Sequence, residues 1–259
     1  MTSRHRIGSV DFTVMPLDAA VQLIMDLPNQ LPSIGHPGAG VHFANAYNVA
    51  LARDNSTYAH LLNSSDYVFS DGVPITWVGK RAYPHKANTW ERVYGPDVMT
   101  LVLQRSQPEA PKHYLLGSTP DVVASLTQQI SQRFPNATIV GTDSPPFREP
   151  STADLAERDL RIAESGATHV WVGLGTPKQD YEVSRIAANL PVVALAVGAA
   201  FDFLAGTKAQ APTWMQRNGL EWAFRFAKEP TRLAKRYVWG NSVFSLEAAR
   251  TLRRGSSGD

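Results

Sequence analysis

The sequence predicts an α/β fold: a mainly parallel sheet with helices on both faces, followed by a helical C-terminal appendage. Short apolar runs alternate with segments of helical periodicity, which is typical of strand–helix–strand crossovers. The apolar runs are nearly continuous, as in strands that are buried on both faces. After Gly198 the sequence becomes rich in aromatic and basic residues, with Pro212 and Pro230 as helix breakers.

Six apolar runs are expected to form the sheet. They cover residues 41–47, 66–71, 113–118, 138–142, 169–175 and 191–198. The clearest helix spans residues 119–134, where Ser118 and Thr119 can cap the first turn and Pro120 can occupy it. In the appendage we expect two helices, about 213–228 and 230–238, and then a frayed polar tail of sequence RRGSSGD.

The predicted strands end in small or polar residues. In an open parallel sheet, ligands bind beyond the carboxyl ends of the strands. We therefore expect the following residues to converge on one edge of the sheet: Asn45, Ser70 to Gly72, Gly117 and Ser118, Gly141 and Thr142, Gly173, Gly175 and Gly198.

The stretch HVWVGLGTPKQD, residues 169–180, contains a glycine turn between a strand and a helix. It lacks the third glycine of the dinucleotide fingerprint and the Gly-Lys-Ser/Thr of a Walker A loop, which disfavours a nicotinamide enzyme. Gly173 and Gly175 allow close backbone approach to a ligand, and the helix N-terminus with Lys178 and Gln179 suits a diphosphate or a sugar hydroxyl. The alternative is a strand–helix turn that binds no ligand.

Asp71 stands at the end of a predicted strand, in VFSDGVPITW. It could be a general base, a metal ligand or a helix cap. No Asp-x-Asp pair and no metal-ligand spacing accompanies it, which favours proton abstraction without a metal. Arg92 precedes a helix that is expected to begin near Pro96, and it could pair with a phosphate or with Asp71.

Composition excludes several classes of protein. The chain has 259 residues and no cysteine, which excludes disulfides, thiolate metal sites and thiol nucleophiles. Its N-terminus has no apolar core of a secretion signal, and no apolar run approaches the ~18 residues of a membrane span. We expect a cytoplasmic, soluble chain, or one that touches a membrane only at its surface.

The basic charge is concentrated near the C-terminus. The net charge is +2, but residues 225–254 contain eight Lys or Arg and two Glu. This asymmetry indicates an anionic partner, namely nucleic acid, membrane headgroups or phosphate, unless the helix face is simply solvated. The appendage aromatics are Trp214, Trp222, Phe224, Phe226, Tyr237 and Trp239.

Nine motifs occur in order between Val41 and Tyr237. They read FANAYNVALA, SDYVFSDGVPITW, ERVYGPDVM, HYLLGSTPDVV, PNATIVGT, VWVGLGTPKQD, GAAFDFLAG, APTWMQRNGLEWAFRF and EPTRLAKRY. Together they resemble the WecG/TagA/CpsF glycosyltransferase family.

The resemblance implies a metal-independent transferase with a Rossmann-like fold and no cofactor. It would move an N-acetylmannosamine-type sugar, or a related hexose or uronic acid, from a UDP donor to an acceptor linked to polyprenyl (undecaprenyl) diphosphate, in the synthesis of bacterial surface polysaccharides such as teichoic acid, capsule or exopolysaccharide. Residues 1–205 would be the nucleotide-sugar-binding catalytic domain. Residues 206–259 would form an appendage that completes the site at the inner face of the cell membrane.

The resemblance also implies roles for individual residues. Asp71 would be the base. The substrate-binding residues would be Asn45, Arg92, Gly173, Gly175, Lys178, Gln179, Asp202, Arg225, Arg232, Lys235 and Arg236. Lys235 replaces an arginine of the family, which keeps the charge but loses the bidentate fork.

The chain departs from the family pattern at three places. Phe43 stands where threonine is usual, Tyr47 where glutamate or aspartate is usual, and residues 143–147 read DSPPF in place of Gly-Tyr-Phe. Phe43 and Pro146 are expected to bear on donor choice.

Two other functions compete with transfer. A non-catalytic scaffold would bind the nucleotide sugar or the lipid carrier and recruit other enzymes. Nucleic-acid binding would use the same basic segment, but the aromatics lie in the appendage rather than on a sheet face that could stack bases. Those aromatics could be buried against a bilayer or against a second subunit.

Overall fold

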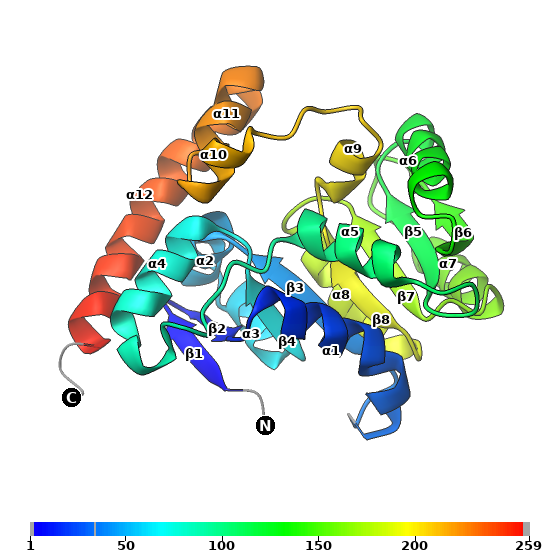
Figure 1. The fold of residues 1–259 in the computed structure, drawn as a ribbon, viewed down its shortest axis with the longest axis horizontal. Coiled ribbons are helices and arrows are strands. Elements are labelled where there is room, and N and C mark those ends of the chain that lie inside the picture. The colour runs from blue at the N-terminus through cyan, green and yellow to red at the C-terminus, as the bar shows by residue number, and fades with distance from the viewer. Residues whose placement is uncertain (1–2, 34, 256–259) are drawn as a thin grey trace. The chain divides into compact units, whose positions relative to one another are not determined.

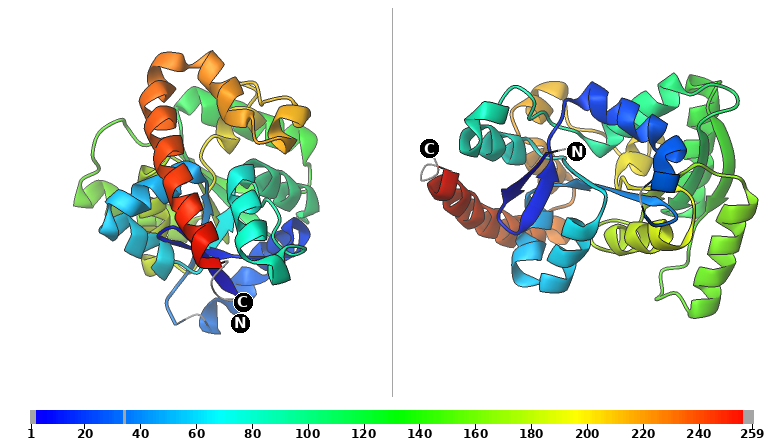
Figure 2. Two further views of the ribbon diagram at one scale, coloured as in Figure 1. Left: turned by 90° about the vertical axis from the view of Figure 1, so that its left-hand side faces the viewer. Right: turned by 90° about the horizontal axis from the view of Figure 1, so that it is seen from below.

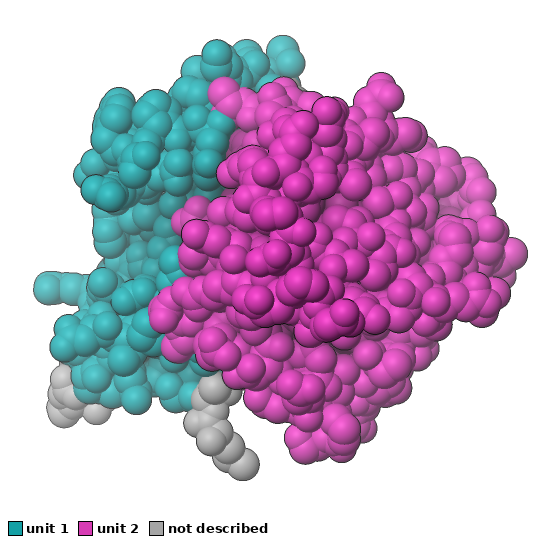
Figure 3. Space-filling model, turned by 45° about the vertical axis from the view of Figure 1, so that its right-hand side comes forward, with its two compact units in different colours: residues 1–17, 43–94, 210–259 teal, residues 18–42, 95–209 magenta. Residues whose placement is uncertain are grey.

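The computed structural model describes residues 3–33 and 35–255 (Figure 1), without the side chains of Arg232, Lys235 and Arg236. The chain forms two compact units, which Figure 3 distinguishes by colour. Unit 1 comprises Met1–Leu17, Phe43–Tyr94 and Gln210–Asp259, and unit 2 comprises Asp18–His42 and Gly95–Ala209. From Gln210 onward, the appendage belongs to the same compact unit as residues 43–94.

The predicted parallel sheet is confirmed. Its order is β4-β3-β8-β7-β5-β6, and all six apolar runs form strands. The bounds are β3 Ala39–Ala44, β4 Tyr67–Ser70, β5 Lys112–Gly117, β6 Thr138–Asp143, β7 His169–Gly173 and β8 Val193–Ala196. Parallel register aligns the ends of β5 and β7, since Gly117 pairs with Gly173.

Helices cover both faces of the sheet in unit 2. They are α1 Leu17–Gln30, α5 Gly95–Arg105, α6 Pro120–Arg133, α7 Thr152–Glu164, α8 Lys178–Asn189 and α9 Ala200–Leu204, with a 3₁₀ turn at Leu31–Ser33. Alternate residues of β7 separate the faces. Val170 and Val172 join the core beneath α7 and α8, whereas the Nε2 of His169 donates a hydrogen bond to the Ile24 carbonyl of α1 at 2.9 Å.

The predicted cap of α6 is confirmed. Thr119 is its N-cap, and the side-chain oxygen accepts a hydrogen bond from the Val122 backbone N–H at 3.4 Å. Pro120 occupies the first turn, where its missing N–H costs nothing. The expected helix near Pro96 is α5, which begins at Gly95.

Unit 1 contains a hairpin that the sequence patterns did not predict. Its strands are β1 Arg4–Ile7 and β2 Val10–Thr13, joined by a turn in which Gly8 has a φ of +60°. The helices of this unit are α2 Ala46–Asp54, α3 Ser56–Ser64, α4 Val73–Ala82, α10 Thr213–Arg217, α11 Glu221–Lys228 and α12 Pro230–Gly255, with a 3₁₀ turn at Pro84–Lys86.

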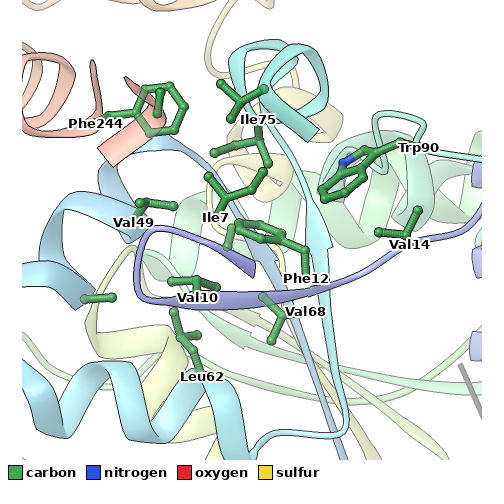
Figure 4. Close-up of a cluster of buried hydrophobic side chains, with 14 of the residues drawn as sticks. Ile7, Val10, Phe12, Val14, Val49, Leu62, Val68, Ile75, Trp90 and Phe244 are labelled. Carbon is green, nitrogen blue, oxygen red and sulfur yellow. The ribbon is translucent and has the colours of Figure 1, made fainter. Parts of the chain in front are cut away.

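The hairpin supplies much of the unit 1 core. Its Ile7 and Phe12 lie among buried side chains of the helices and of β4 (Figure 4). The core residues labelled in Figure 4 are Ile7, Val10, Phe12, Val14, Val49, Leu62, Val68, Ile75, Trp90 and Phe244. Burial of this apolar surface is what holds the three chain segments of unit 1 together.

The appendage differs from its prediction in two ways. The first predicted helix is split into α10 and α11 at Gly219, whose φ of +70° is left-handed. The second runs to Gly255, well past residue 238, because Val243, Phe244 and Ala248 form a buried stripe at helical spacing. Figure 2 shows α12 running beside α2 and α4. Of the predicted frayed tail, residues 253–255 are helical, and residues 256–259 lie outside the described chain.

Candidate functional site

A cavity of about 100 Å³ lies within unit 1. Its wall is formed by the ends of two strands, by the segment after Thr89 and by the appendage. The lining residues are Asn45, Ala46, Tyr47, Asp71, Gly72, Val73, Pro74, Arg92, Gln216, Gly219, Glu221, Trp222, Arg225, Tyr237 and Asn241. The cavity therefore brings together four of the residues predicted for substrate and catalysis: Asn45, Asp71, Arg92 and Arg225.

Asn45 and Asp71 follow neighbouring strands. The backbone N–H of Asp71 donates to the Ala44 carbonyl at 3.0 Å, which holds the two strand ends together. The N-cap of α4 is Gly72, with no side-chain cap, so Asp71 is not the N-cap of this helix. Asn45 does cap a helix: its Oδ1 accepts a hydrogen bond from the Tyr47 N–H at 3.0 Å at the start of α2.

Arg92 is held from two sides. Its Nε donates to the backbone carbonyl of Asp71 at 2.7 Å, and its Nη2 donates to Glu221 at 2.6 Å. The guanidinium also lies 3.8 Å from the centre of the Tyr94 ring, a cation–π contact. Three partners thus fix Arg92 at the wall of the cavity.

Glu221 joins Arg92 to Arg225. Its Oε1 lies 2.6 Å from Nη2 of Arg225 and accepts a 2.7 Å hydrogen bond from the hydroxyl of Tyr94. The Nη2 of Arg225 also donates to that hydroxyl at 3.2 Å. The Glu221 carboxylate, which is only 14% exposed, therefore binds two guanidinium groups and a phenol hydroxyl.

This network keeps its donors protonated. Burial raises the pKa of Tyr94 well above its usual value, and the Glu221 carboxylate raises it further. Burial is the largest single influence on Arg225 and lowers its pKa, but Glu221, Tyr94, Tyr237 and Asp71 together outweigh it, so the pKa is raised. Both groups are donors at physiological pH.

Glu221 was missed in the sequence analysis. The available signal was its i,i+4 spacing from Arg225 within one helix. Its pairing with Arg92 had no sequence signal, because the two residues are 129 positions apart.

The glycine turn of residues 173–175 belongs to unit 2. A Cβ at Gly173 would lie 2.8 Å from the ring of Phe201, and Gly175 has a left-handed φ of +77°. Gln179 is 4% exposed. Its Oε1 accepts from the Gly175 N–H at 3.1 Å and its Nε2 donates to the Ala196 carbonyl at 3.1 Å. These contacts give the glycines and Gln179 structural roles in shaping the turn.

The helix that follows this turn is α8. Its N-cap is Pro177, and Lys178 is its first residue. Lys178 pairs with Glu149 at 3.4 Å between two well-exposed side chains. Asp202, in α9, pairs with Lys208 at 3.3 Å.

Three predicted substrate-binding side chains, Arg232, Lys235 and Arg236, lie outside the described side chains, although their backbone is part of α12. Within residues 3–33 and 35–255, no group of three or more His, Asp or Glu residues is placed to hold a metal ion. In the same part of the chain, no helix is long and apolar enough to cross a membrane.

The departures from the family pattern fall in different environments. Phe43 is 5% exposed, and its ring stacks on Phe69 with 6.0 Å between centroids, so it belongs to the interior and does not line the cavity. Pro146 lies in the exposed segment between β6 and α7. Tyr47, by contrast, lines the cavity.

Comparison with known protein families identifies the family of the chain. The family model described as the glycosyl transferase WecG/TagA/CpsF family matches residues 5–258. That match covers nearly the whole chain, both compact units included. The chain therefore belongs to the WecG/TagA/CpsF family of glycosyltransferases.

Proposed function

We propose that this protein transfers a sugar from a UDP donor to an acceptor linked to polyprenyl diphosphate, in the synthesis of a bacterial surface polysaccharide. The donor sugar would be of the N-acetylmannosamine type or a related hexose or uronic acid. The observation that carries the proposal is the placement of Asp71 in one cavity with Arg92 and Arg225. A carboxylate can accept a proton there while guanidinium groups neutralise a diphosphate.

In the proposed reaction, the Asp71 carboxylate takes the proton from a hydroxyl group of the lipid-linked sugar. The oxygen of that hydroxyl attacks the anomeric carbon of the donor sugar. A carbon–oxygen bond forms to the acceptor as the bond to the UDP oxygen breaks, and UDP leaves with the electron pair. This single displacement inverts the anomeric configuration and needs no metal.

The guanidinium groups of Arg92 and Arg225 would stabilise the charge that develops on the departing UDP. Their shared contact with Glu221 keeps both groups at the cavity wall before substrate arrives. Arg232, Lys235 and Arg236 of the appendage are proposed to bind phosphate as well. The turn at Gly173 and Gly175, with Lys178, Gln179 and Asp202 of unit 2, is proposed to contribute to donor binding.

We further propose that the protein works at the inner face of the cell membrane. Trp214 is 61% exposed and Trp222 is 41% exposed, and both belong to the basic appendage. Indole rings are favoured at headgroup depth, and each basic residue near an anionic leaflet contributes about 1 kcal/mol. Salt-sensitive binding to anionic liposomes but not to RNA is the expected result, whereas equal binding to RNA would favour the nucleic-acid alternative.

The central test measures UDP release without added metal, with a panel of UDP-sugars and a short-chain polyprenyl-diphosphate-GlcNAc acceptor. We expect release that depends on the acceptor with one donor of the panel. UDP binding without transfer from any donor would favour the non-catalytic scaffold.

Asp71→Asn tests the base. The variant should bind UDP normally and lose about 10²- to 10⁴-fold in turnover. Asp66→Asn is the matched control, because Asp66 directly precedes β4 at its opposite end and does not line the cavity. Retained turnover in Asp71→Asn would exclude Asp71 as the base.

A further inference from the structure

The cavity of unit 1 has an aromatic wall as well as a charged one. Tyr47 of α2, Trp222 of α11 and Tyr237 of α12 all line it. Trp222 and Tyr237 meet edge to face, with ring centroids 6.1 Å apart at 62°. We define these three rings as the aromatic wall.

Tyr47 is held in place by its surroundings. Its ring meets Trp239 edge-on, with 6.0 Å between centroids. A Cβ at position 240 would lie 3.2 Å from Cδ2 of Tyr47, so Gly240 leaves the space that the ring needs. The Tyr47 ring is therefore fixed by packing between α2 and α12 and is preorganised at the cavity.

Polar side chains that could form hydrogen bonds with sugar hydroxyl groups lie next to the aromatic wall. Asn45, Asp71 and Asn241 line the same cavity. A pyranose ring presents an apolar C–H face and a rim of hydroxyl groups, and pockets for such ligands combine aromatic walls with a few placed amides and carboxylates. Asp71 can take a proton only from a hydroxyl within hydrogen-bond reach, so a sugar that it activates must lie in this cavity.

We infer that the aromatic wall is the binding subsite for the pyranose ring of the lipid-linked acceptor, and that Tyr47 helps to determine which acceptor sugar is used. This inference rests on the proposed function, because it takes Asp71 as the base of the acceptor hydroxyl. It assigns the wall to the acceptor sugar, and neither to the uracil of the donor nor to the polyprenyl chain.

The test compares two lipids that differ only in the sugar ring: a short-chain polyprenyl-diphosphate-GlcNAc and the same polyprenyl diphosphate without sugar. Binding of each is measured by calorimetry on the full-length protein. Loss of one stacked ring should weaken binding of the sugar-bearing lipid about tenfold in Tyr47→Leu. Binding of the sugar-free lipid and of UDP should stay within about twofold, and Tyr47→Phe should behave like the unmodified protein.

Trp222→Leu is a second variant of the aromatic wall. Because Trp222 is 41% exposed, its replacement should disturb the packing of the unit less than replacement of Tyr47 does. Phe226→Leu is the control, since Phe226 touches Tyr237, with 6.5 Å between centroids, but does not line the cavity. In kinetics, Tyr47→Leu should raise KM for the acceptor and leave KM for the donor unchanged.

Equal weakening of both lipids, or weaker binding of UDP alone, would overturn the inference. A fall in melting temperature with unchanged binding of both lipids would show that Tyr47 contributes only to packing. That result would also overturn the inference. A protein that binds the acceptor sugar through Tyr47 but transfers nothing would refute the proposed function and leave the inference standing.

Discussion

The carboxylate of Glu221 accepts a 2.6 Å hydrogen bond from Nη2 of Arg92, a residue 129 positions earlier in the chain. Residues of α10 and α11 contribute no buried side chain to the core. The Glu221 network is a polar contact of α11 with the segment that follows Thr89. It ties part of the appendage to the wall of the cavity.

Glu221→Gln should loosen this contact. The amide removes the charge that Arg92 and Arg225 share, which leaves two partly buried guanidinium groups with weaker partners. We expect the free energy of unfolding to fall by about 1–3 kcal/mol and UDP binding to weaken. Chemical denaturation and calorimetry measure both effects.

The matched control is Glu157→Gln, which removes an exposed i,i+4 pair with Arg161. It should change stability by less than about 0.5 kcal/mol. Equal effects of the two substitutions would contradict a special role of Glu221.

Phe43→Thr introduces the residue that is usual in the family. Because Phe43 is buried against Phe69, the change should lower the free energy of unfolding by about 3 kcal/mol, mainly through the cavity it leaves. The order of preference among UDP-sugars should be unchanged. A new preferred donor with unchanged stability would show that position 43 selects the sugar after all.

Gly173→Ala should destabilise unit 2 through a contact with Phe201. The added Cβ would lie 2.8 Å from Cδ2 of that ring, and such overpacking costs about 1–3 kcal/mol. Phe201→Leu in the same chain should recover part of the loss, so the double variant should be more stable than additivity predicts.

Gly175→Ala provides the comparison. Within the described part of the chain, no atom outside the neighbouring residues lies within 4 Å of the added Cβ, but the φ of Gly175 is +77°. The substitution should therefore cost about 1–2 kcal/mol from backbone strain and show no coupling to Phe201. Strict additivity of Gly173→Ala and Phe201→Leu in denaturation would refute the contact.

Acid should destabilise unit 2 through two buried histidines. Burial lowers the pKa of His113 from 6.5 to about 3, with a further contribution from His169, and burial lowers the pKa of His169 from 6.5 to about 4. The Nδ1 of His113 accepts a 3.1 Å hydrogen bond from the indole N–H of Trp171, which requires the neutral ring.

Between pH 6.5 and about 4 the unfolded chain binds more protons at these rings than the folded chain does. The free energy of unfolding therefore falls as pH decreases through this range, by roughly 2 kcal/mol for each ring at pH 5. Denaturation at several pH values measures the slope. His169→Gln, which keeps a donor for the Ile24 carbonyl, should reduce it, and His60→Gln on the exposed face of α3 should not. An unchanged slope in His169→Gln would contradict the attribution of this pH dependence to His169.

Much of the fold could be predicted from local patterns. The six strands were found because continuous apolar runs report burial on both faces, and α6 was found because its cap and its periodicity lie within one short segment. The hairpin of β1 and β2 was missed, since its two strands have only four residues each. The length of α12 was missed because polar residues and the exposed Arg250, Arg253 and Arg254 obscured the buried stripe of Val243, Phe244 and Ala248.

The candidate site was predicted in part. Asn45, Asp71, Arg92 and Arg225 line one cavity as the motifs implied, whereas Gln179 turned out to have both ends of its amide bonded within unit 2. Burial of Phe43 and the position of Tyr47 at the cavity followed from the packing of whole elements, which no motif records.

The sequence by itself determined the α/β class, the parallel strands, the family and the candidate side chains of the site. Each of these depends on periodicity or on residues close together in the chain. Only the tertiary structure decided that Glu221 bridges Arg92 and Arg225, that Gly240 makes room for Tyr47, and that the aromatic wall adjoins Asp71. Such contacts join residues far apart in the sequence, and they exist because burial of the unit 1 core brings three separate chain segments into one compact body.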